Sequence, residues 1–349
     1  MADSPQEPHD ELGQVDDHEA TETISTGTLP DAETIRRLLR QAHRRYAGND
    51  DGAVADHIPA LADADPGLFG ISLTSIEGDV YSVGDTAHTF TIQSISKAFV
   101  FALACRELGH EPVRNTVGVN NTGLPFDSVM ALELNGGHPM NPMVNAGALA
   151  TSALVPGEDL EAKWNFIRDG LSRFAGRRLE LDEDAWASEQ AANQRNTGIA
   201  RLLESHGRMD FDAADATDLF TRQCSLLVTA EDLSAMGATL SAGGVNPVTG
   251  DEVVGPEVAR DTLAVLASTG MYEASGDWLF EIGLPAKSGV SGGVVTVSPG
   301  KGGLATYSAP LDDAGTSVRG QLAAGFLSAR LGLNLFASRP AAQRAARGD

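Results

Sequence analysis

The segment at residues 95–108 constrains the fold of this chain more strongly than any other, because it is apolar on nearly every side. A helix with a single apolar stripe lies on the surface of a protein, whereas a helix that is apolar all round is surrounded by other elements. A membrane span needs about 20 consecutive apolar residues, and no run in this chain approaches that length. We therefore predict a helix that is buried inside a soluble protein.

Strand and helix patterns flank this buried helix in a definite order. Alternating apolar residues predict strands at residues 69–74, 80–83, 290–297 and 304–307. Helical spacing predicts helices at residues 31–46, 157–178, 188–205 and 317–332, and a stretch rich in Gly, Asn and Pro predicts a loop at residues 119–142. This order is typical of an α/β sandwich with a mostly antiparallel sheet and a helical subdomain inserted in its middle. We expect a catalytic cleft between the two parts.

The same patterns divide the chain into a body and two tails. Residues 1–30 are polar, acidic and aperiodic, which predicts a disordered tail, and residues 337–349 predict a frayed basic tail. The body, residues 31–336, is expected to consist of an α/β part at 31–113 and 225–336 and a helical insert at 114–224.

The charge of the chain narrows the classes of partner. The net charge is −23, and residues 1–35 hold ten acidic residues and no Lys or Arg. The remainder holds 38 acidic against 25 basic residues, a net charge of −13. This excess of negative charge argues against nucleic acids and anionic membranes as partners. It is typical of adaptation to a salt-rich habitat, and equally of an ordinary enzyme that carries a solvated acidic tail.

The cysteines and the N-terminal sequence indicate the cellular compartment in which we expect the protein. Cys105 and Cys224 each lie in an apolar context, and we expect two buried free thiols, which fits a reducing cytosol. The N-terminus has neither the basic region nor the apolar region of a signal peptide, so we expect a cytoplasmic protein. Because Cys and His residues do not cluster, no metal site is predicted.

A Ser-x-x-Lys pattern, Ser94 and Lys97, stands at the start of the buried helix. Residues three apart share a helical face, so the serine hydroxyl and the lysine amine can meet. An amine in apolar surroundings loses proton affinity and can act as a base, while the helix dipole favours a developing alkoxide. Ser96 is a poorer candidate for the nucleophile, because neighbours in a helix do not share a face. A second match, Ser298 to Lys301, contains Pro-Gly and cannot form such a helix.

Lysine usage supports the choice of Lys97. The chain has four lysines against 21 arginines, and arginine cannot supply a neutral amine. A second lysine, Lys287, starts the sequence Lys-Ser-Gly-Val before a Gly-rich strand. Serine enzymes of the β-lactamase and penicillin-binding type pair a Ser-x-x-Lys helix with a Lys-Thr-Gly strand edge. By that arrangement, the backbone N–H groups of Val290 and Ser94 are predicted to form an oxyanion hole.

Four segments carry a resemblance to a known family: residues 93–97, 141–148, 270–272 and 283–290, in this order along the chain. Together they resemble the signature segments of the serine-dependent glutaminases, the family that includes the kidney-type mitochondrial and the bacterial enzymes. The resemblance extends over about residues 34–336. It implies a β-lactamase-like fold, no metal ion or organic cofactor, Ser94 as the nucleophile and Lys97 as the base.

The resemblance also implies roles for residues outside the Ser-x-x-Lys pattern. Tyr272 matches the family's catalytic tyrosine, and Asn145, Glu189 and Asn196 match the groups that bind the amino-acid head of glutamine. A carboxylate can pair with the substrate's α-ammonium, and amides can donate to its α-carboxylate. Without the resemblance, Glu189 and Asn196 on one face of a helix at 188–203 are as typical of a solvated stripe. Asn145 is then as typical of a helix cap, and Tyr272 of a packed aromatic.

Two positions depart from the family's pattern. Where the family usually has Tyr before Ile-Pro, this chain has His57, and where it usually has Tyr shortly before Gln-Cys-Ser, this chain has Phe220. Both tyrosines line the substrate pocket of the family. The departures therefore bear on the affinity for glutamine and leave the nucleophile and the base unchanged.

The leading hypothesis is hydrolysis of L-glutamine to L-glutamate and ammonia through an acyl-enzyme on Ser94, with Tyr272 and Val290 also contacting the substrate. The resemblance implies a homodimer or homotetramer. One alternative is a penicillin-recognising hydrolase or peptidase with the same Ser/Lys apparatus, although the N-terminus speaks against an exported enzyme. The other is a catalytically weak protein that binds or senses an amino acid, which His57 and Phe220 would favour.

Overall fold

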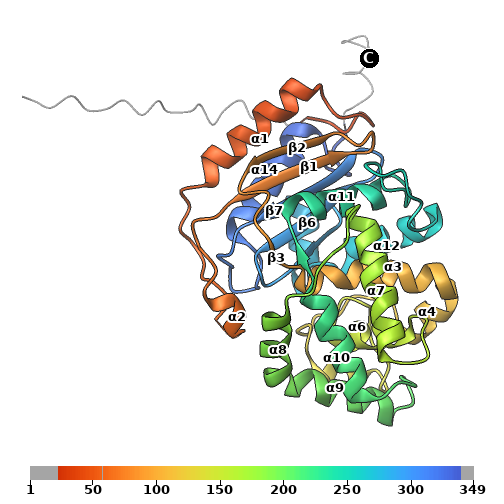
Figure 1. Ribbon diagram of the computed structural model, residues 1–349. Helices are drawn as coiled ribbons and strands as arrows, with labels where there is room; N and C mark the ends of the chain where they lie inside the picture. The colour runs from red at the N-terminus through yellow and green to blue at the C-terminus, as the bar shows by residue number, and fades with distance from the viewer. Residues whose placement is uncertain (1–22, 57, 339–349) are drawn as a thin grey trace, which may run out of the picture.

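An antiparallel sheet of five strands forms the centre of one half of this computed structural model, which describes residues 23–56 and 58–338. The strand order is β2-β1-β7-β6-β5. Figure 1 labels the first four of these strands. Short turns connect three of the four neighbouring pairs, and only the β1–β7 pair joins distant parts of the chain. The strands are β1 (Gly70–Ser75), β2 (Val80–Gly84), β5 (Ala286–Ser288), β6 (Gly293–Ser298) and β7 (Gly302–Tyr307).

Residues along the central strands alternate between two apolar layers, as the two-residue period of a strand requires. Val294 joins the layer between the sheet and helices α1 and α14, whereas Val295 joins the layer on the opposite face, where helix α11 packs. The approach of α11 to β7 depends on Gly303, because a Cβ atom there would collide with the α11 backbone. The covering helices are α1 (Ala32–Tyr46), α11 (Ala230–Ser241) and α14 (Val318–Leu331).

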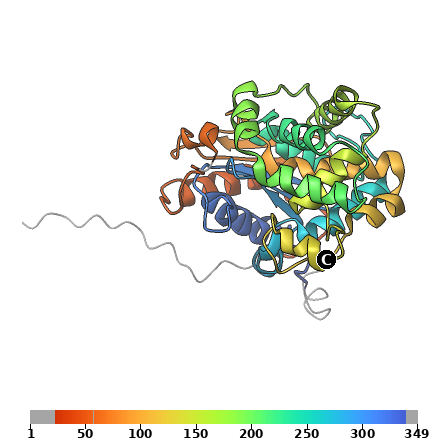
Figure 2. The same ribbon diagram turned by 90° about the horizontal axis from the view of Figure 1, so that it is seen from below.

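Helices from the middle of the chain form the second half, which lies below the sheet in Figure 1 and in front of it in Figure 2. They are α3 (Ser96–Leu108), α4 (His110–Val117), α5 (Val129–Leu134), α6 (Asn145–Leu154), α7 (Leu160–Ala175), α8 (Glu183–Ala192), α9 (Gln194–Ser205) and α10 (Ala213–Cys224). The remaining elements are α2 (Pro59–Ala62), α12 (Pro256–Thr269), α13 (Ser275–Glu281), the short pair β3 (Phe90–Thr91) and β4 (Leu227–Val228), and the single 3₁₀ turns η2 (Gln93–Ile95) and η3 (Tyr272–Ala274).

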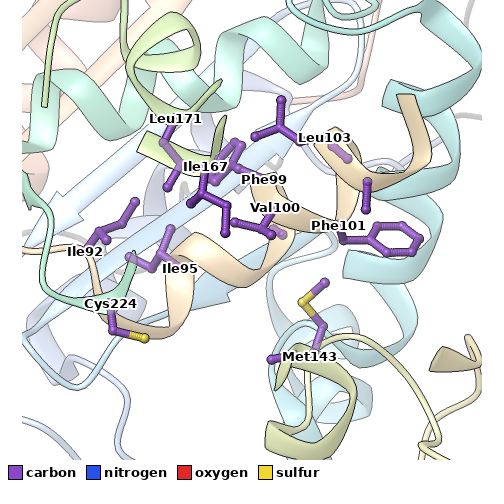
Figure 3. Close-up of a cluster of buried hydrophobic side chains, with 14 of the residues drawn as sticks. Ile92, Ile95, Phe99, Val100, Phe101, Leu103, Met143, Ile167, Leu171 and Cys224 are labelled. Atoms are coloured by element: carbon purple, nitrogen blue, oxygen red, sulfur yellow. The ribbon is translucent and has the colours of Figure 1, made fainter. Parts of the chain in front are cut away.

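Helix α3 is buried on all sides, which confirms the prediction from the apolar run. All residues at positions 96–105 are buried, and helices α6, α7 and α12 pack against α3. In Figure 3, Phe99 of α3 lies beside Ile167 and Leu171 of α7. The start of α3 carries Lys97, so the fold places one charged side chain in an apolar core.

The predicted helix at residues 188–205 is wrong, because the structure has two helices there. Helices α8 and α9 meet at Asn193, whose φ of −88° and ψ of 26° interrupt the helix. The Asn193 side chain donates to Thr221 Oγ1 of α10 over 2.5 Å. A tertiary hydrogen bond therefore accompanies the break. Residues 189–197 contain neither Gly nor Pro, so the sequence gives no local signal for the end of a helix there.

Two further boundaries differ from the prediction. The strand expected at residues 290–297 begins at Gly293, since residues 290–292 form the hairpin turn that follows β5, with Gly292 at a φ of 104°. The loop expected at residues 119–142 contains helix α5, which begins where the Ser128 side chain accepts from Ala131 N. The other predicted helices and strands are present within one to three residues of their expected ends.

Three expectations concern the thiols, the membrane and the tails. Cys105 and Cys224 are buried and free, as predicted. None of the helices in residues 23–56 and 58–338 combines the length and apolar character that a membrane span requires. Most of the predicted tails, namely residues 1–22 and 339–349, lies outside the described residues. Where the described chain begins, Thr23 N donates to Ala329 O over 2.8 Å, so this end contacts α14.

Candidate active site

A cavity of about 410 Å³ lies where the helical half meets the sheet half. Six of the site residues predicted from the sequence line it: Ser94, Asn145, Glu189, Asn196, Tyr272 and Val290. The seventh, Lys97, lies behind this wall and is only 1% exposed. Phe220 also lines the cavity, as the resemblance implied, whereas His57 lies outside the described residues. The fold therefore brings together residues that are up to 196 positions apart, from Ser94 to Val290.

Ser94 lies in the 3₁₀ turn η2, directly before α3, and is partly exposed to the cavity. The preceding residue, Gln93, has a φ of 51°, a conformation that is uncommon for a residue with a side chain. Strand β5 and its turn approach η2 closely, because Gly289 has no side chain. A Cβ atom on Gly289 would lie 3.0 Å from Ile92 O and 3.2 Å from the Gln93 Cβ. This close approach places Val290 beside the nucleophile candidate on the cavity wall.

The amine of Lys97 is held by neighbours from two other elements. Its Nζ donates to Met143 O over 3.0 Å, to Asn145 Oδ1 over 2.7 Å and to the Tyr272 hydroxyl over 3.4 Å. The rings of Phe126, Phe220 and Tyr272 surround it at 5.3–5.8 Å from Nζ to the ring centroid. Burial lowers the pKa of Lys97 to about 8, despite the opposing negative groups nearby.

Within the described residues, Lys97 has no hydrogen bond to Ser94, although their spacing predicted that the two side chains meet. The reason is that Ser94 belongs to η2 rather than to α3, so the two residues do not share one regular helical face. Tyr272 lies between them instead. Its hydroxyl accepts from Lys97, and a hydrogen bond to the Ser94 side chain opposes the rise that burial causes in the pKa of Tyr272.

Tyr272 itself occupies a constrained position at the start of η3. Its φ is 56°, and its ring stacks on Phe126 with 4.7 Å between the centroids. Lys287 Nζ lies 3.9 Å from the centroid of the same ring and donates to Ser288 O over 3.0 Å. Burial, with repulsion from Lys97, holds the pKa of Lys287 well below its usual value. A second buried amine thus borders the site on the side of β5.

Three predicted substrate-binding residues, Asn145, Glu189 and Asn196, take part in two hydrogen-bonded pairs on the cavity wall. Gln93 Nε2 donates to Glu189 Oε1 over 2.6 Å, and Asn145 Nδ2 donates to Asn196 Oδ1 over 2.9 Å. Burial raises the pKa of Glu189 to about 7, and the hydrogen bond from Gln93 only partly opposes that rise. Because Asn145 also accepts from Lys97, a single amide connects the buried amine with helix α9.

Sequence reasoning missed several polar residues of this wall, among them Gln93, Asn193 and Arg195. Arg195 Nε pairs with Asp127 Oδ2 over 2.5 Å, which joins α9 to the segment before α5. The position of Gln93, directly before Ser94, was a signal that could have identified it. Asn193 and Arg195 carried no such signal, because their place depends on the break between α8 and α9.

The part of the chain that the structure describes contains no group of three His, Cys, Asp or Glu side chains placed to hold a metal ion. What the site offers instead is a hydroxyl, a phenol and a partly buried carboxylate on the cavity wall, with two buried amines next to the phenol. A hydroxyl beside an amine of lowered pKa is the arrangement that activates a serine for nucleophilic attack. The site is therefore suited to acyl transfer.

Comparison with known proteins agrees with this chemistry. Residues 52–336 match the family model named Glutaminase. The chain is 51% identical over 317 residues to Glutaminase 2 of Yersinia pestis, which covers 91% of this chain and 93% of that protein. It is 45% identical over 308 residues to a glutaminase of Brucella canis, which covers 88% of this chain and 97% of that protein.

Solved structures agree at the level of the fold. A probable glutaminase, ybaS, superposes with a TM-score of 0.87 at 42% identity, over 88% of this chain and 99% of that one. Mglu in its glutamate form superposes with a TM-score of 0.83 at 38% identity, over 88% of this chain and 71% of that one. These matches confirm the predicted β-lactamase-like α/β fold with its antiparallel sheet. The chain belongs to the glutaminase family.

Proposed function

We propose that this protein hydrolyses L-glutamine to L-glutamate and ammonia, with Ser94 as the nucleophile and Lys97 as the general base. Glutaminases are the relatives that match nearly the whole chain, which supports the substrate. The observation that carries the mechanism is the environment of Lys97, a buried amine with a pKa of about 8 that contacts Tyr272 beside Ser94. An amine with that pKa is partly neutral near pH 7–8 and can accept a proton.

The reaction begins when Ser94 Oγ attacks the carbon of the side-chain amide. Its proton passes through the Tyr272 hydroxyl to the neutral amine of Lys97, in the order in which the three groups contact one another. The developing negative charge on the amide oxygen is stabilised by the backbone N–H groups of Ser94 and Val290. Lys97 then returns the proton to the amide nitrogen, which leaves as ammonia while Ser94 keeps the acyl group as an ester.

Water completes the reaction. A water molecule that enters the place of ammonia gives a proton to Lys97 and attacks the ester carbon. Glutamate leaves, and the proton returns to Ser94 Oγ, so the enzyme ends in its starting state. Burial keeps Tyr272 protonated outside these exchanges, because it raises the pKa of the phenol. Tyr272 therefore acts as a relay and Lys97 as the group that stores the proton.

The amino-acid head of glutamine binds on the helical side of the cavity in this proposal. Glu189 pairs with the α-ammonium, and Asn145 and Asn196 donate to the α-carboxylate. The wall supports this placement, since Glu189 is a partly buried carboxylate with a hydrogen bond from Gln93 alone among the side chains described. A bound ammonium would supply the opposite charge that Glu189 otherwise lacks.

An ammonia-release assay tests the proposal. We expect the wild-type protein to release ammonia from L-glutamine and much less from L-asparagine and D-glutamine. Ser94→Ala and Lys97→Arg should each reduce turnover by at least about a thousandfold, since nucleophile and base act as a unit. Ser96→Ala is the matched control and should keep most of the turnover. Its hydroxyl donates to Gln93 O within the buried start of α3 and does not line the cavity. Activity in Ser94→Ala close to that of the wild type would contradict the mechanism.

A further inference from the structure

Helix α8 carries much of the wall that binds the substrate head, yet few apolar contacts hold it in place. Ser188, Glu189 and Ala192 line the cavity. Among the described residues of α8, Ala185 alone is buried. A helix normally docks through an apolar stripe. The position of α8 must therefore depend on polar contacts.

Those polar contacts converge on one carboxylate of helix α10. Trp186 Nε1 donates to Asp218 Oδ1 over 2.7 Å, and Gln190 Nε2 donates to the same oxygen over 2.5 Å. Trp186 and Gln190 are four residues apart and share one face of α8. Glu189 lies between them in sequence. Asp218 therefore holds the turn of α8 that carries Glu189.

The carboxylate of Asp218 is itself fixed. Its second oxygen pairs with Arg222 NH2 over 2.9 Å, and only 14% of its side chain is exposed. Arg222 also pairs with Glu161 of α7 over 2.6 Å, and its guanidinium carbon lies 5.3 Å from the Trp186 ring centroid. One oxygen of Asp218 thus accepts both hydrogen bonds from α8, and the other pairs with Arg222. The pair with Arg222 fixes the orientation of the carboxylate and therefore the geometry of its contact with α8.

We infer that Asp218 is a positioning residue for substrate recognition, which fixes helix α8 on α10 and thereby sets the place of Glu189 in the cavity. This inference rests on the proposed role of Glu189 in binding the substrate's α-ammonium. Without Asp218, the face of α8 that carries Trp186 and Gln190 loses its acceptor. Helix α8 then occupies several positions, and only some of them present Glu189 correctly. Ground-state and transition-state binding both weaken, so KM rises while kcat changes little.

Two substitutions separate positioning from a general effect on stability. Asp218→Ala removes both oxygens, whereas Asp218→Asn keeps a carbonyl oxygen for Trp186 and Gln190 and loses the pair with Arg222. We expect Asp218→Ala to raise KM for glutamine at least about tenfold, the effect of a lost hydrogen bond to a charged group, with kcat within about threefold of the wild type. Asp218→Asn should keep KM within about threefold. The matched control, Glu161→Gln, removes the other partner of Arg222 and should leave KM unchanged.

The measurements are steady-state kinetics and melting curves on the full chain. A folded Asp218→Ala variant with the KM of the wild type would overturn the inference, as would equal losses in the Ala and Asn variants. If Asp218→Ala does not fold, Trp186→Phe and Gln190→Leu remove the donors one at a time and should each raise KM. Unchanged KM in both would overturn the inference.

A binding experiment distinguishes failure of this inference from failure of the proposed function. Calorimetry with glutamine on Ser94→Ala, with and without Asp218→Ala, requires no turnover. A Kd that rises at least about tenfold with Asp218→Ala supports the inference, and an unchanged Kd overturns it. The proposed function fails on a different result, namely that the wild-type protein releases no ammonia from glutamine or that Ser94→Ala remains active.

Discussion

Replacing Asn145 with aspartate should shift the pH dependence of turnover to higher pH, because it places a carboxylate against the amine of Lys97. Asn145 Oδ1 accepts from Lys97 Nζ over 2.7 Å. In the wild type, burial lowers the pKa of Lys97 to about 8. In the proposed mechanism the base is the neutral amine, so kcat should rise as the pH increases through about 8 and level off above it.

The size of the shift follows from the distance between the two groups. An opposite charge within about 4–6 Å changes the pKa of an ionisable group by about 1–3 in the direction that favours its charged form. The pKa of Lys97 should therefore rise. At a pH below that pKa, each rise of the pKa by one lowers the neutral fraction of the amine about tenfold. We expect kcat of Asn145→Asp at pH 7.5 to fall at least about tenfold and to recover in large part near pH 10.

The assay is ammonia release at saturating glutamine between pH 6 and 10, with stability checked at each pH. Asn196→Asp is the matched control, since it adds the same charge at a site that contacts Asn145 rather than Lys97. Its kcat profile should move less than that of Asn145→Asp. An active Asn145→Asp variant whose midpoint equals that of the wild type would refute the assignment of Lys97 as the titrating base.

Three further predictions test other parts of the site and the surface. Burial raises the pKa of Glu189 to about 7, and its proposed role requires the carboxylate form, so KM should fall as the pH rises through about 7. Glu189→Gln should abolish that dependence in KM measured across pH. Phe220→Tyr should lower KM about tenfold with little change in kcat, since an added hydroxyl can donate to the substrate; an unchanged KM with a lower melting temperature would contradict this. Added salt screens repulsion within residues 36–349, whose net charge is −13, so the melting temperature should hold or rise toward molar sodium chloride, and inactivation well below that concentration would count against it.

The features predicted correctly from the sequence are those whose cause is local. The apolar run after Ser94 requires a buried helix, whatever the rest of the chain does. The hairpin between residues 69 and 84 follows from two alternating segments around a Glu-Gly-Asp turn. Spacing and the scarcity of lysine point to Ser94 and Lys97; Ser94 lines the cavity, and Lys97 lies behind its wall, where its amine contacts Tyr272.

The features that could not be predicted arise from contacts between distant segments. Lys97 is oriented by Met143 and Asn145, more than 40 residues away, and its link to Ser94 runs through Tyr272. The break at Asn193 accompanies a hydrogen bond to α10, and no local signal marks it. The resemblance to the glutaminases identified the residues of the wall, but the way in which α8 is held became evident only from its contacts with Asp218.

Two residues next to Ser94, at the start of the buried helix, have a strained backbone conformation. Gln93 and Tyr272 are the only residues other than glycine with a positive φ in the part of the chain that the structure describes, and both adjoin Ser94. Such a conformation costs about 1–3 kcal/mol for each residue and persists only where the surroundings leave no alternative. For Gln93 the surroundings are the start of α3 and the close approach of Gly289, and for Tyr272 they are the stacked ring of Phe126 and the amine of Lys287. Tight packing around α3 therefore holds the serine and the phenol in a fixed orientation, the condition that the proposed transfer of a proton between them requires.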